Sequence, residues 1–266
     1  MVLTKRKLLY VAIAVLSVIL VILLCIVSKP KAQPQPETLP TETVEPETEP
    51  PNPNQFTYIN GFLSCVTADS IVGIDVSSHQ GEIDWQQVKA SGVEFVMIRA
   101  GYRGLDQGGL YEDEYAQSNY KGAKQAGLKI GAYFFSQATT EEEAIKEAEF
   151  ALVITKDWQL DFPLAYDWEF SGEENRVAAI TAAQVTEFAQ IFCAEIEKAG
   201  NSPMVYFNPD LGRNFLYLEE LTDYPFWLAL YDRDFRYDYK ITMWQYTCEG
   251  TVPGIEGNVD INLYFP

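Results

Sequence analysis

The stretch FPLAYDWE, from Phe162 to Glu169, is apolar and aromatic and ends on acidic side chains. Proline suits the first position of a strand, where no ladder donor is needed, so this stretch is predicted to be a strand. Because side chains alternate along a strand, Asp167 and Glu169 lie on one face, with their Cα atoms about 7 Å apart.

Asp167 and Glu169 repel each other at this spacing when both are ionised. At a partly buried strand end the repulsion raises the pKa of at least one carboxyl. One group can then stay protonated while the other is charged, which is the equipment for glycoside hydrolysis. Taken alone, the stretch is equally compatible with a strand end that carries two solvated acids.

Strand-like and helix-like segments alternate on both sides of this stretch. Thr140-x-x-Glu143 and Thr181-x-x-Gln184 are predicted to be capping boxes that open helices, and Gly127 is predicted to end another helix. The predicted strands cover residues 71–76, 93–99, 128–135, 163–169, 203–207, 225–231, 241–247 and 258–264. The predicted helices cover residues 84–90, 112–125, 140–156 and 181–199, with a short one near 209–220.

Five βα units followed by three strands predict an α/β fold, an incomplete (β/α)8 TIM-like barrel with parallel or mostly parallel strands. Chemistry in such barrels sits at the carboxyl ends of the strands, where Asp167 and Glu169 fall. Asp75 closes the first strand and Asp260 lies in the eighth. These two aspartates are predicted to belong to the same site, or to form a structural hydrogen-bonded pair across the barrel closure.

The N-terminal part of the chain is predicted to hold one transmembrane helix before the barrel. Residues 1–7 form a basic stub, and residues 8–27 are an uncharged apolar run that spans about 30 Å as a helix. Basic residues before the run favour a cytoplasmic N-terminus. The alternative is a cleaved signal peptide, whose apolar region is usually about 7–15 residues and precedes an Ala-x-Ala-like site. The run is longer and the site is absent, so a signal anchor in the cell membrane is favoured.

The remaining boundaries follow from composition. Residues 28–55 are rich in Pro, Glu and Thr and are predicted to be a disordered, extended linker. Residues 56–70 are predicted to be a lead-in segment that packs on the domain, and residues 71–266 are predicted to be the catalytic barrel.

Charge and histidine content exclude several functions. Formal net charge is −19, with 19 Lys and Arg against 38 Asp and Glu, which argues against a nucleic-acid partner. His79 is the one histidine, so two-His zinc motifs are excluded, and we expect it in a loop or at the barrel mouth. No Gly-x-Ser-x-Gly elbow exists. We expect no metal and no cofactor.

Four cysteines are present. Cys25 lies in the apolar run, and Cys193 fits a buried helix position. Cys65 and Cys248 could form a disulfide outside the cell, although the pairing does not follow from sequence alone.

Aromatic side chains gather near the predicted strand ends. Aromatic faces with a few polar groups suit sugar rings, although each ring could equally serve in the core. They are Tyr102, Tyr133, Phe135, Tyr206, Trp227, Trp244 and Tyr246.

Six motifs resemble those of family 25 glycoside hydrolases, which are muramidases (lysozymes) of bacterial and phage origin. They occur in the family's order and span residues 71–264, nearly the whole predicted domain. The motifs are GIDVSSHQG with IDW (residues 73–85), FVMIRAGYR (95–103), GLKIGAYFFS (127–136), DWE (167–169), WQYT (244–247) and VDIN (259–262).

The resemblance implies hydrolysis of the β-1,4 bond between N-acetylmuramic acid and N-acetylglucosamine in peptidoglycan glycan strands. Glu169 would be the general acid, and Asp167 would orient the reacting N-acetyl group or stabilise the oxocarbenium-like centre. Asp75 and Asp260 would line the same pocket. The substrate-binding residues would be Tyr102, Tyr133, Phe135, Tyr206, Trp244 and Gln245.

Two positions depart from the family pattern. Cys248 stands where a small polar residue is expected, which a Cys65–Cys248 bridge would explain. Phe134-Phe135 stands where many relatives carry a histidine, so a polar contact to the substrate would be missing or replaced.

Three other functions remain open. A non-catalytic wall-binding module could use the same barrel. A chitinase-like glycosidase would need the Asp-x-x-Asp-x-Asp-x-Glu motif, but Ala165 stands at one of its acidic positions. A purely structural membrane anchor would leave the acids and aromatics unexplained. The oligomeric state is open.

Overall fold

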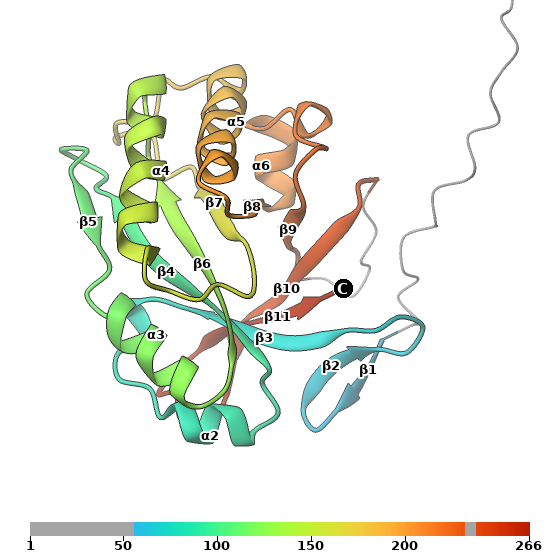
Figure 1. The fold of residues 1–266 in the computed structure, drawn as a ribbon. Coiled ribbons are helices and arrows are strands. Elements are labelled where there is room, and N and C mark those ends of the chain that lie inside the picture. Colours follow the sequence, from blue (N-terminus) through green and yellow to red (C-terminus); the bar gives the residue numbers. More distant parts are fainter. Residues whose placement is uncertain (1–55, 232–237) are drawn as a thin grey trace, which may run out of the picture. The chain divides into compact units, whose positions relative to one another are not determined.

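Eight strands close into a barrel in the computed structural model of the chain, which describes residues 56–231 and 238–266 (Figure 1). Neighbouring strands are hydrogen-bonded, and β3 pairs with both β4 and β11, which completes the closure. The predicted barrel is therefore confirmed. Its strands are β3 (Ile71–Val76), β4 (Phe95–Arg103), β6 (Lys129–Ser136), β7 (Leu164–Trp168), β8 (Pro203–Phe207), β9 (Phe226–Ala229), β10 (Ile241–Gly250) and β11 (Val259–Tyr264).

The last strand runs against the others. The other seven barrel strands form parallel ladders with one another, whereas β11 is antiparallel to both β10 and β3. A parallel pair needs a crossover of about a dozen residues or more, whereas an antiparallel pair can be joined by a short connection. Only residues 251–258 separate β10 from β11, so β11 folds back. The start of β11 therefore lies at the same end of the barrel as the carboxyl ends of the other strands.

The helices pack outside the barrel, with α4 on β4 and β6 and α5 on β7 and β8. The Thr181 capping box is formed with Gln184. At α4 only half of the predicted box forms, because Thr140 accepts from the Glu143 amide while the Glu143 side chain binds Thr139 and Arg176. The helices are α2 (Trp85–Ala90), α3 (Ala116–Gln125), α4 (Glu141–Thr155), α5 (Ala182–Lys198) and α6 (Pro209–Asn214), with 3-10 turns η2 (Ser78–Gln80) and η3 (Leu218–Glu220).

The helix predicted to begin at Glu112 starts at Ala116 instead. Residues Leu110–Glu112 form the short strand β5, which pairs antiparallel with the end of β4. Tyr111 stacks there on Tyr102, with ring centroids 5.4 Å apart. Cross-strand contacts of this kind outweigh helix propensity at the edge of a sheet.

The lead-in segment folds into a hairpin of β1 (Phe56–Ile59) and β2 (Phe62–Cys65). Asn60 and Gly61 both have positive φ, at 52° and 88°, as a two-residue hairpin turn of type I′ requires. Phe56 packs edge-on against Trp244 at 5.1 Å between ring centroids. The lead-in therefore packs on β10.

The candidate disulfide is not formed in the structure, where Cys65 and Cys248 are both free thiols. Cys65 is buried in the hairpin with its Sγ 3.5 Å from Thr67 Oγ1. Cys248 is exposed near the end of β10, beside Tyr231. The two sulfurs thus have different neighbours. A Cys65–Cys248 bridge therefore does not explain the cysteine at position 248 in this structure.

The predicted transmembrane helix (8–27) and linker (28–55) lie outside the described residues. Within residues 56–231 and 238–266, no helix has the length and apolar character needed to cross a bilayer.

Candidate active site

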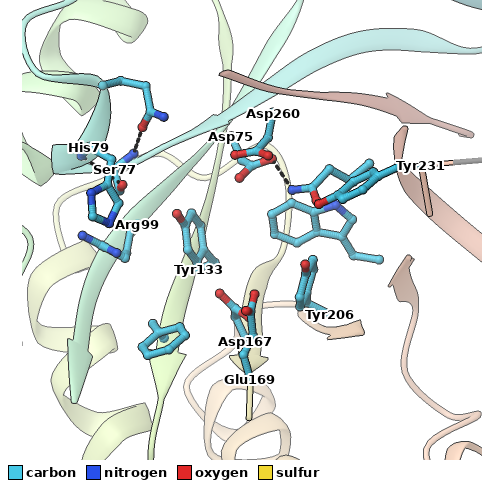
Figure 2. Close-up of a pocket in the computed structure, with 14 residues that line it drawn as sticks. Asp75, Ser77, His79, Arg99, Tyr133, Asp167, Glu169, Tyr206, Tyr231 and Asp260 are labelled. Carbon is cyan, nitrogen blue, oxygen red and sulfur yellow. Dashed lines mark hydrogen bonds between the residues drawn. The ribbon is translucent and has the colours of Figure 1, made fainter. Parts of the chain in front are cut away.

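A cavity of about 220 Å³ opens among the carboxyl ends of the parallel strands (Figure 2). Eight of the predicted site residues line it: the four acids, three of the aromatics and Gln245. The complete lining is Asp75, Ser77, His79, Gln80, Arg99, Tyr133, Phe135, Asp167, Glu169, Tyr206, Trp227, Tyr231, Gln245 and Asp260.

The four acids come from three strands. Asp75 lies near the end of β3, Asp167 lies near the end of β7, and Glu169 directly follows β7. Asp260 is the second residue of β11 and pairs in register with Asp75, because β11 is antiparallel. Figure 2 shows Asp167 and Glu169 side by side, facing the Asp75–Asp260 pair.

Asp75 and Asp260 form a carboxyl pair, joined by a side-chain hydrogen bond. Asp75 Oδ2 also accepts hydrogen bonds from Gln245 Nε2 and Asn262 Nδ2, each at 2.8 Å. Burial, followed by the negative charge of Asp260, raises the pKa of Asp75. Burial also raises the pKa of Asp260, to about 6. The pair therefore holds a proton in the mildly acidic range.

Asp167 and Glu169 also lie where ionisation is disfavoured. Burial raises the pKa of Asp167, with further contributions from the charges of Glu169 and Asp75. Burial likewise raises the pKa of Glu169, against a hydrogen bond from Tyr206 that lowers it. Asp167 is only 6% exposed, and its Oδ1 has no hydrogen-bond partner among the described residues. Glu169 can thus act as an acid, while Asp167 has an oxygen available for a ligand donor.

The backbone of Glu169 is held by a fully buried glutamine, Gln137. The β6–β7 ladder ends where Ser136 pairs with Trp168, so Glu169 lies beyond it. Gln137 Nε2 donates to the carbonyl oxygens of Ser136 (2.8 Å) and Glu169 (2.9 Å). Arg176 Nη1 donates to the Gln137 carbonyl oxygen at 2.6 Å. One side chain thereby extends the strand pairing to the acid.

Aromatic rings form one wall of the cavity. Trp227 contacts Tyr133 and Tyr206 edge-to-face, with centroid distances of 5.9 and 5.1 Å. Burial raises the pKa of both tyrosines, so their hydroxyls stay neutral donors. Apolar ring faces combined with fixed polar groups match the mixed surface of a sugar.

Two predicted binding residues lie outside the cavity. Tyr102 stacks on Tyr111 and lies under the Arg99 guanidinium, whose carbon is 5.2 Å from the ring centroid. Trp244 is buried, and its Nε1 donates to the Leu230 carbonyl oxygen at 2.7 Å. Tyr102 lies near the carboxyl end of β4, whereas Trp244 lies within β10, where alternate side chains point away from the barrel axis.

Six lining residues were not among the predicted site residues: Ser77, His79, Gln80, Arg99, Trp227 and Tyr231. Of these, His79 was expected in a loop or at the barrel mouth, and Trp227 was among the aromatics near strand ends. Arg99 lies within β4 and is paired with Asp113 at 2.8 Å. Tyr231 lies two residues beyond β9. The strand-end rule, applied to every strand, would have found Ser77 and Tyr231, which follow β3 and β9, whereas Arg99 lies within β4.

Metal ligands do not gather in the part of the chain that the structure describes. No three His, Cys, Asp or Glu side chains there are arranged to hold an ion.

Comparison with known proteins places this geometry in context. Residues 74–255 match the sequence pattern of the glycosyl hydrolases family 25. The chain is 31% identical over 193 residues to the autolytic lysozyme of Clostridium acetobutylicum, covering 72% of this chain and 55% of that protein. It is 26% identical over 207 residues to lysozyme M1 of Streptomyces globisporus, covering 73% and 67%.

Among solved structures, the modular autolysin LytC from Streptococcus pneumoniae has a similar fold. The TM-score is 0.68 at 24% identity, and the match covers 79% of this chain and 52% of that one. The chain thus spans about half the length of LytC and of the clostridial lysozyme.

Proposed function

The chain belongs to glycosyl hydrolases family 25, and on that basis we propose that it is a peptidoglycan muramidase. It hydrolyses the β-1,4 bond between N-acetylmuramic acid and N-acetylglucosamine. The names of its relatives, an autolytic lysozyme and lysozyme M1, support this substrate class.

Glu169 is the general acid that protonates the leaving glycosidic oxygen. Its raised pKa supports this role, because a general acid must keep its proton near the working pH. Asp167, with one buried oxygen that has no protein donor, accepts the N–H of the substrate's acetamido group. Asp75 and Asp260 stabilise positive charge that develops on the sugar ring in an oxocarbenium-like transition state.

The observation that carries this proposal is the convergence of four carboxyl groups on one aromatic-walled cavity, with Glu169 flanked by Tyr206. A wall-binding module would need the aromatic wall but not a buried acid with a raised pKa. The acids therefore favour an enzyme over a binding module.

The full-length chain in detergent should be incubated with purified peptidoglycan beside the Glu169→Gln variant. We expect reducing muramic acid ends, identified by mass spectrometry, with the native protein, and turnover reduced about 10²- to 10⁴-fold in the variant. Reducing glucosamine ends would overturn the bond assignment. Binding without cleavage by the native protein would favour the wall-binding module.

We also propose that residues 8–27 anchor the enzyme in the cytoplasmic membrane with the barrel on the outer face. The uncharged apolar run behind a basic stub supports this topology. In fractionated cells the full-length mass should sediment with membranes, and deletion of residues 8–27 should release it. Recovery of a shortened, soluble chain from unmodified cells would support a cleaved signal peptide instead.

A further inference from the structure

One row of side chains runs from the active site to the edge strand β5. In the register of the parallel ladders, Asp167 on β7 pairs with Phe135 on β6, and Phe135 pairs with Tyr102 on β4. Tyr102 in turn pairs with Tyr111 on β5. Residues paired directly across adjacent strands share a face of the sheet. Phe135, Tyr102 and Tyr111 therefore form an aromatic strip in line with Asp167.

The aromatic strip becomes more exposed toward its outer end. Phe135 lines the cavity, and both Phe135 and Tyr102 are half-buried, whereas Tyr111 is 49% exposed. Neighbouring strands lie about 4.8 Å apart, so three strand spacings put Tyr111 about 14 Å from Asp167 along the sheet. The strip therefore begins in the cavity wall and ends in solvent.

Contacts on the inner side hold the two tyrosines in place. Tyr102 stacks on Tyr111 with ring centroids 5.4 Å apart, and the Arg99 guanidinium carbon lies 5.2 Å from the Tyr102 ring centroid. Arg99 is itself fixed by Asp113 at 2.8 Å and by the Ser78 hydroxyl at 3.1 Å. A surface that is ordered before a ligand arrives loses less conformational entropy when the ligand binds.

The tip of the β4–β5 hairpin fixes the outer ring. Gly104 and Gly109 face each other there, and the Gly104 amide donates to the Gly109 carbonyl oxygen at 2.8 Å. A Cβ on Gly104 would lie 3.1 Å from Tyr111 Cε2, and one on Gly109 would lie 2.8 Å from the Tyr111 hydroxyl oxygen. The Tyr111 ring therefore lies against glycine backbone, and side chains at these positions would displace it.

The tyrosines also offer polar groups. Neither the Tyr102 hydroxyl nor the Tyr111 hydroxyl forms a hydrogen bond with a residue that the structure describes. A phenol hydroxyl can both donate and accept, and an aromatic ring with a polar tip suits a sugar, which has apolar C–H faces and a rim of hydroxyls. Cross-strand packing explains why the two rings meet, but it does not explain why the row continues into the cavity.

The cavity by itself is small for a glycan. Its volume of about 220 Å³ is below the range of about 300–1,000 Å³ that is usual for pockets that enclose drug-sized ligands. Several linked sugars would therefore continue over the surface beside it, where the strip provides half-exposed rings and hydroxyls free to bond.

We infer that the aromatic strip is a subsite that binds sugar residues of the glycan strand beyond those held in the cavity. The identity of the ligand as a peptidoglycan glycan rests on the proposed function. Tyr111, at the open end of the strip, contributes its ring to the outermost of these sugars.

The test measures glycan binding by the full-length chain in detergent, with Glu169→Gln present throughout so that the ligand is not cleaved. The ligands are fragments of two and of six sugars, in which N-acetylglucosamine and N-acetylmuramic acid alternate. Titration calorimetry gives the Kd of each fragment. We expect Tyr111→Ala to weaken binding of the six-sugar fragment about 5- to 30-fold, and that of the two-sugar fragment less than about 2-fold.

Two further variants separate binding from folding. Tyr111→Phe keeps the ring, so it should bind the six-sugar fragment more tightly than Tyr111→Ala. Tyr58→Ala removes an exposed tyrosine from the other hairpin and should leave both affinities unchanged. If Tyr111 only stabilises the hairpin, Tyr111→Ala will weaken both fragments alike. An unchanged affinity of Tyr111→Ala for the six-sugar fragment would likewise overturn the inference.

Cleavage of peptidoglycan by the native chain separates this inference from the proposed function. An inactive native chain, combined with a selective loss of six-sugar binding in Tyr111→Ala, would refute the muramidase and retain the subsite. An active native chain, combined with equal six-sugar affinities, would refute only the subsite. Failure of both fragments to bind would also refute the subsite.

Discussion

In the proposed mechanism Glu169 acts as an acid only while it is protonated, and its neighbours shift its pKa in opposite directions. Burial and the charge of Asp260 raise the pKa of Glu169, while the Tyr206 hydrogen bond lowers it. The sequence alone predicted that Asp167 and Glu169 form an acidic pair, because side chains alternate along a strand. The contribution of Tyr206 depends on β8 lying next to β7.

Replacing Tyr206 with phenylalanine removes a donor that stabilises the ionised form of Glu169. We therefore expect Tyr206→Phe to raise the pKa of Glu169 and to move the alkaline limb of the pH–rate profile to higher pH. Tyr217→Phe, an exposed tyrosine near η3, should leave the profile unchanged. A shift toward lower pH in Tyr206→Phe would contradict the assignment.

Gln137 holds the carbonyl of Glu169 beyond the end of the ladder. We expect Gln137→Leu to lower kcat about 10- to 100-fold, because a displacement near 1 Å at the acid has costs of this size. KM should change little, since Gln137 does not line the cavity. Thr186→Val, which removes a buried, bonded hydroxyl on α5, is the control. A loss expressed in KM alone would argue against this role.

At the scale of elements, local patterns predicted most of the helices and strands. The alternation of apolar residues, the Thr181 box and the glycine after α3 each act within a few residues of chain, so they can be recognised in sequence. The predicted start of a helix at Glu112 was wrong, because residues Leu110–Glu112 pair with β4. This contact joins two strands, so no local sequence pattern indicates it.

The capping box of α5 provides an energetic test. The Thr181 hydroxyl accepts a hydrogen bond from the Gln184 backbone amide, and Gln184 Oε1 accepts one from the Thr181 backbone amide. We expect Thr181→Ala to lower the free energy of unfolding by about 0.5–2 kcal/mol, measured by urea denaturation. Thr251→Ala, at an exposed position between β10 and β11, should change it by less than about 0.5 kcal/mol.

At the scale of the whole molecule, buried acids couple stability to pH. Burial raises the pKa of Glu147 to about 7, although Arg103 partly opposes the shift. Burial raises that of Asp260 to about 6. A raised folded pKa contributes stability that is complete below the unfolded value, near pH 4, and is lost as the pH rises through the folded value.

We therefore expect the free energy of unfolding to fall between pH 5 and pH 8, by about 3 kcal/mol from Glu147 if it acts alone. Denaturant titrations at both pH values measure this difference. The lowered pKa of Glu143, about 2, has the opposite effect but only at lower pH. Higher stability at pH 8 than at pH 5 would contradict the prediction.

Net charge leads to a second molecular prediction. The chain carries −19, and bacterial walls, which hold the proposed substrate, are also anionic, so the two repel each other. Salt screens such repulsion beyond about 10 Å at 0.1 M. We expect turnover of intact walls to rise with moderate salt, and turnover of short neutral glycan fragments to change little. Equal salt responses for the two substrates would argue against long-range repulsion.

The sequence by itself determined the order of strands and helices, the acidic pair on the strand of residues 162–169 and the family resemblance, because these depend on short-range periodicity and motif order. Only the tertiary structure decided that Asp260 meets Asp75, because this requires β11 to run antiparallel and in register with β3. It likewise decided that Tyr231 and Trp227 hydrogen-bond the two amides that donate to Asp75, whereas Trp244 serves the packing outside the cavity. Side chains far apart in the chain are brought together by strand direction, register and barrel closure, and no local pattern specifies these.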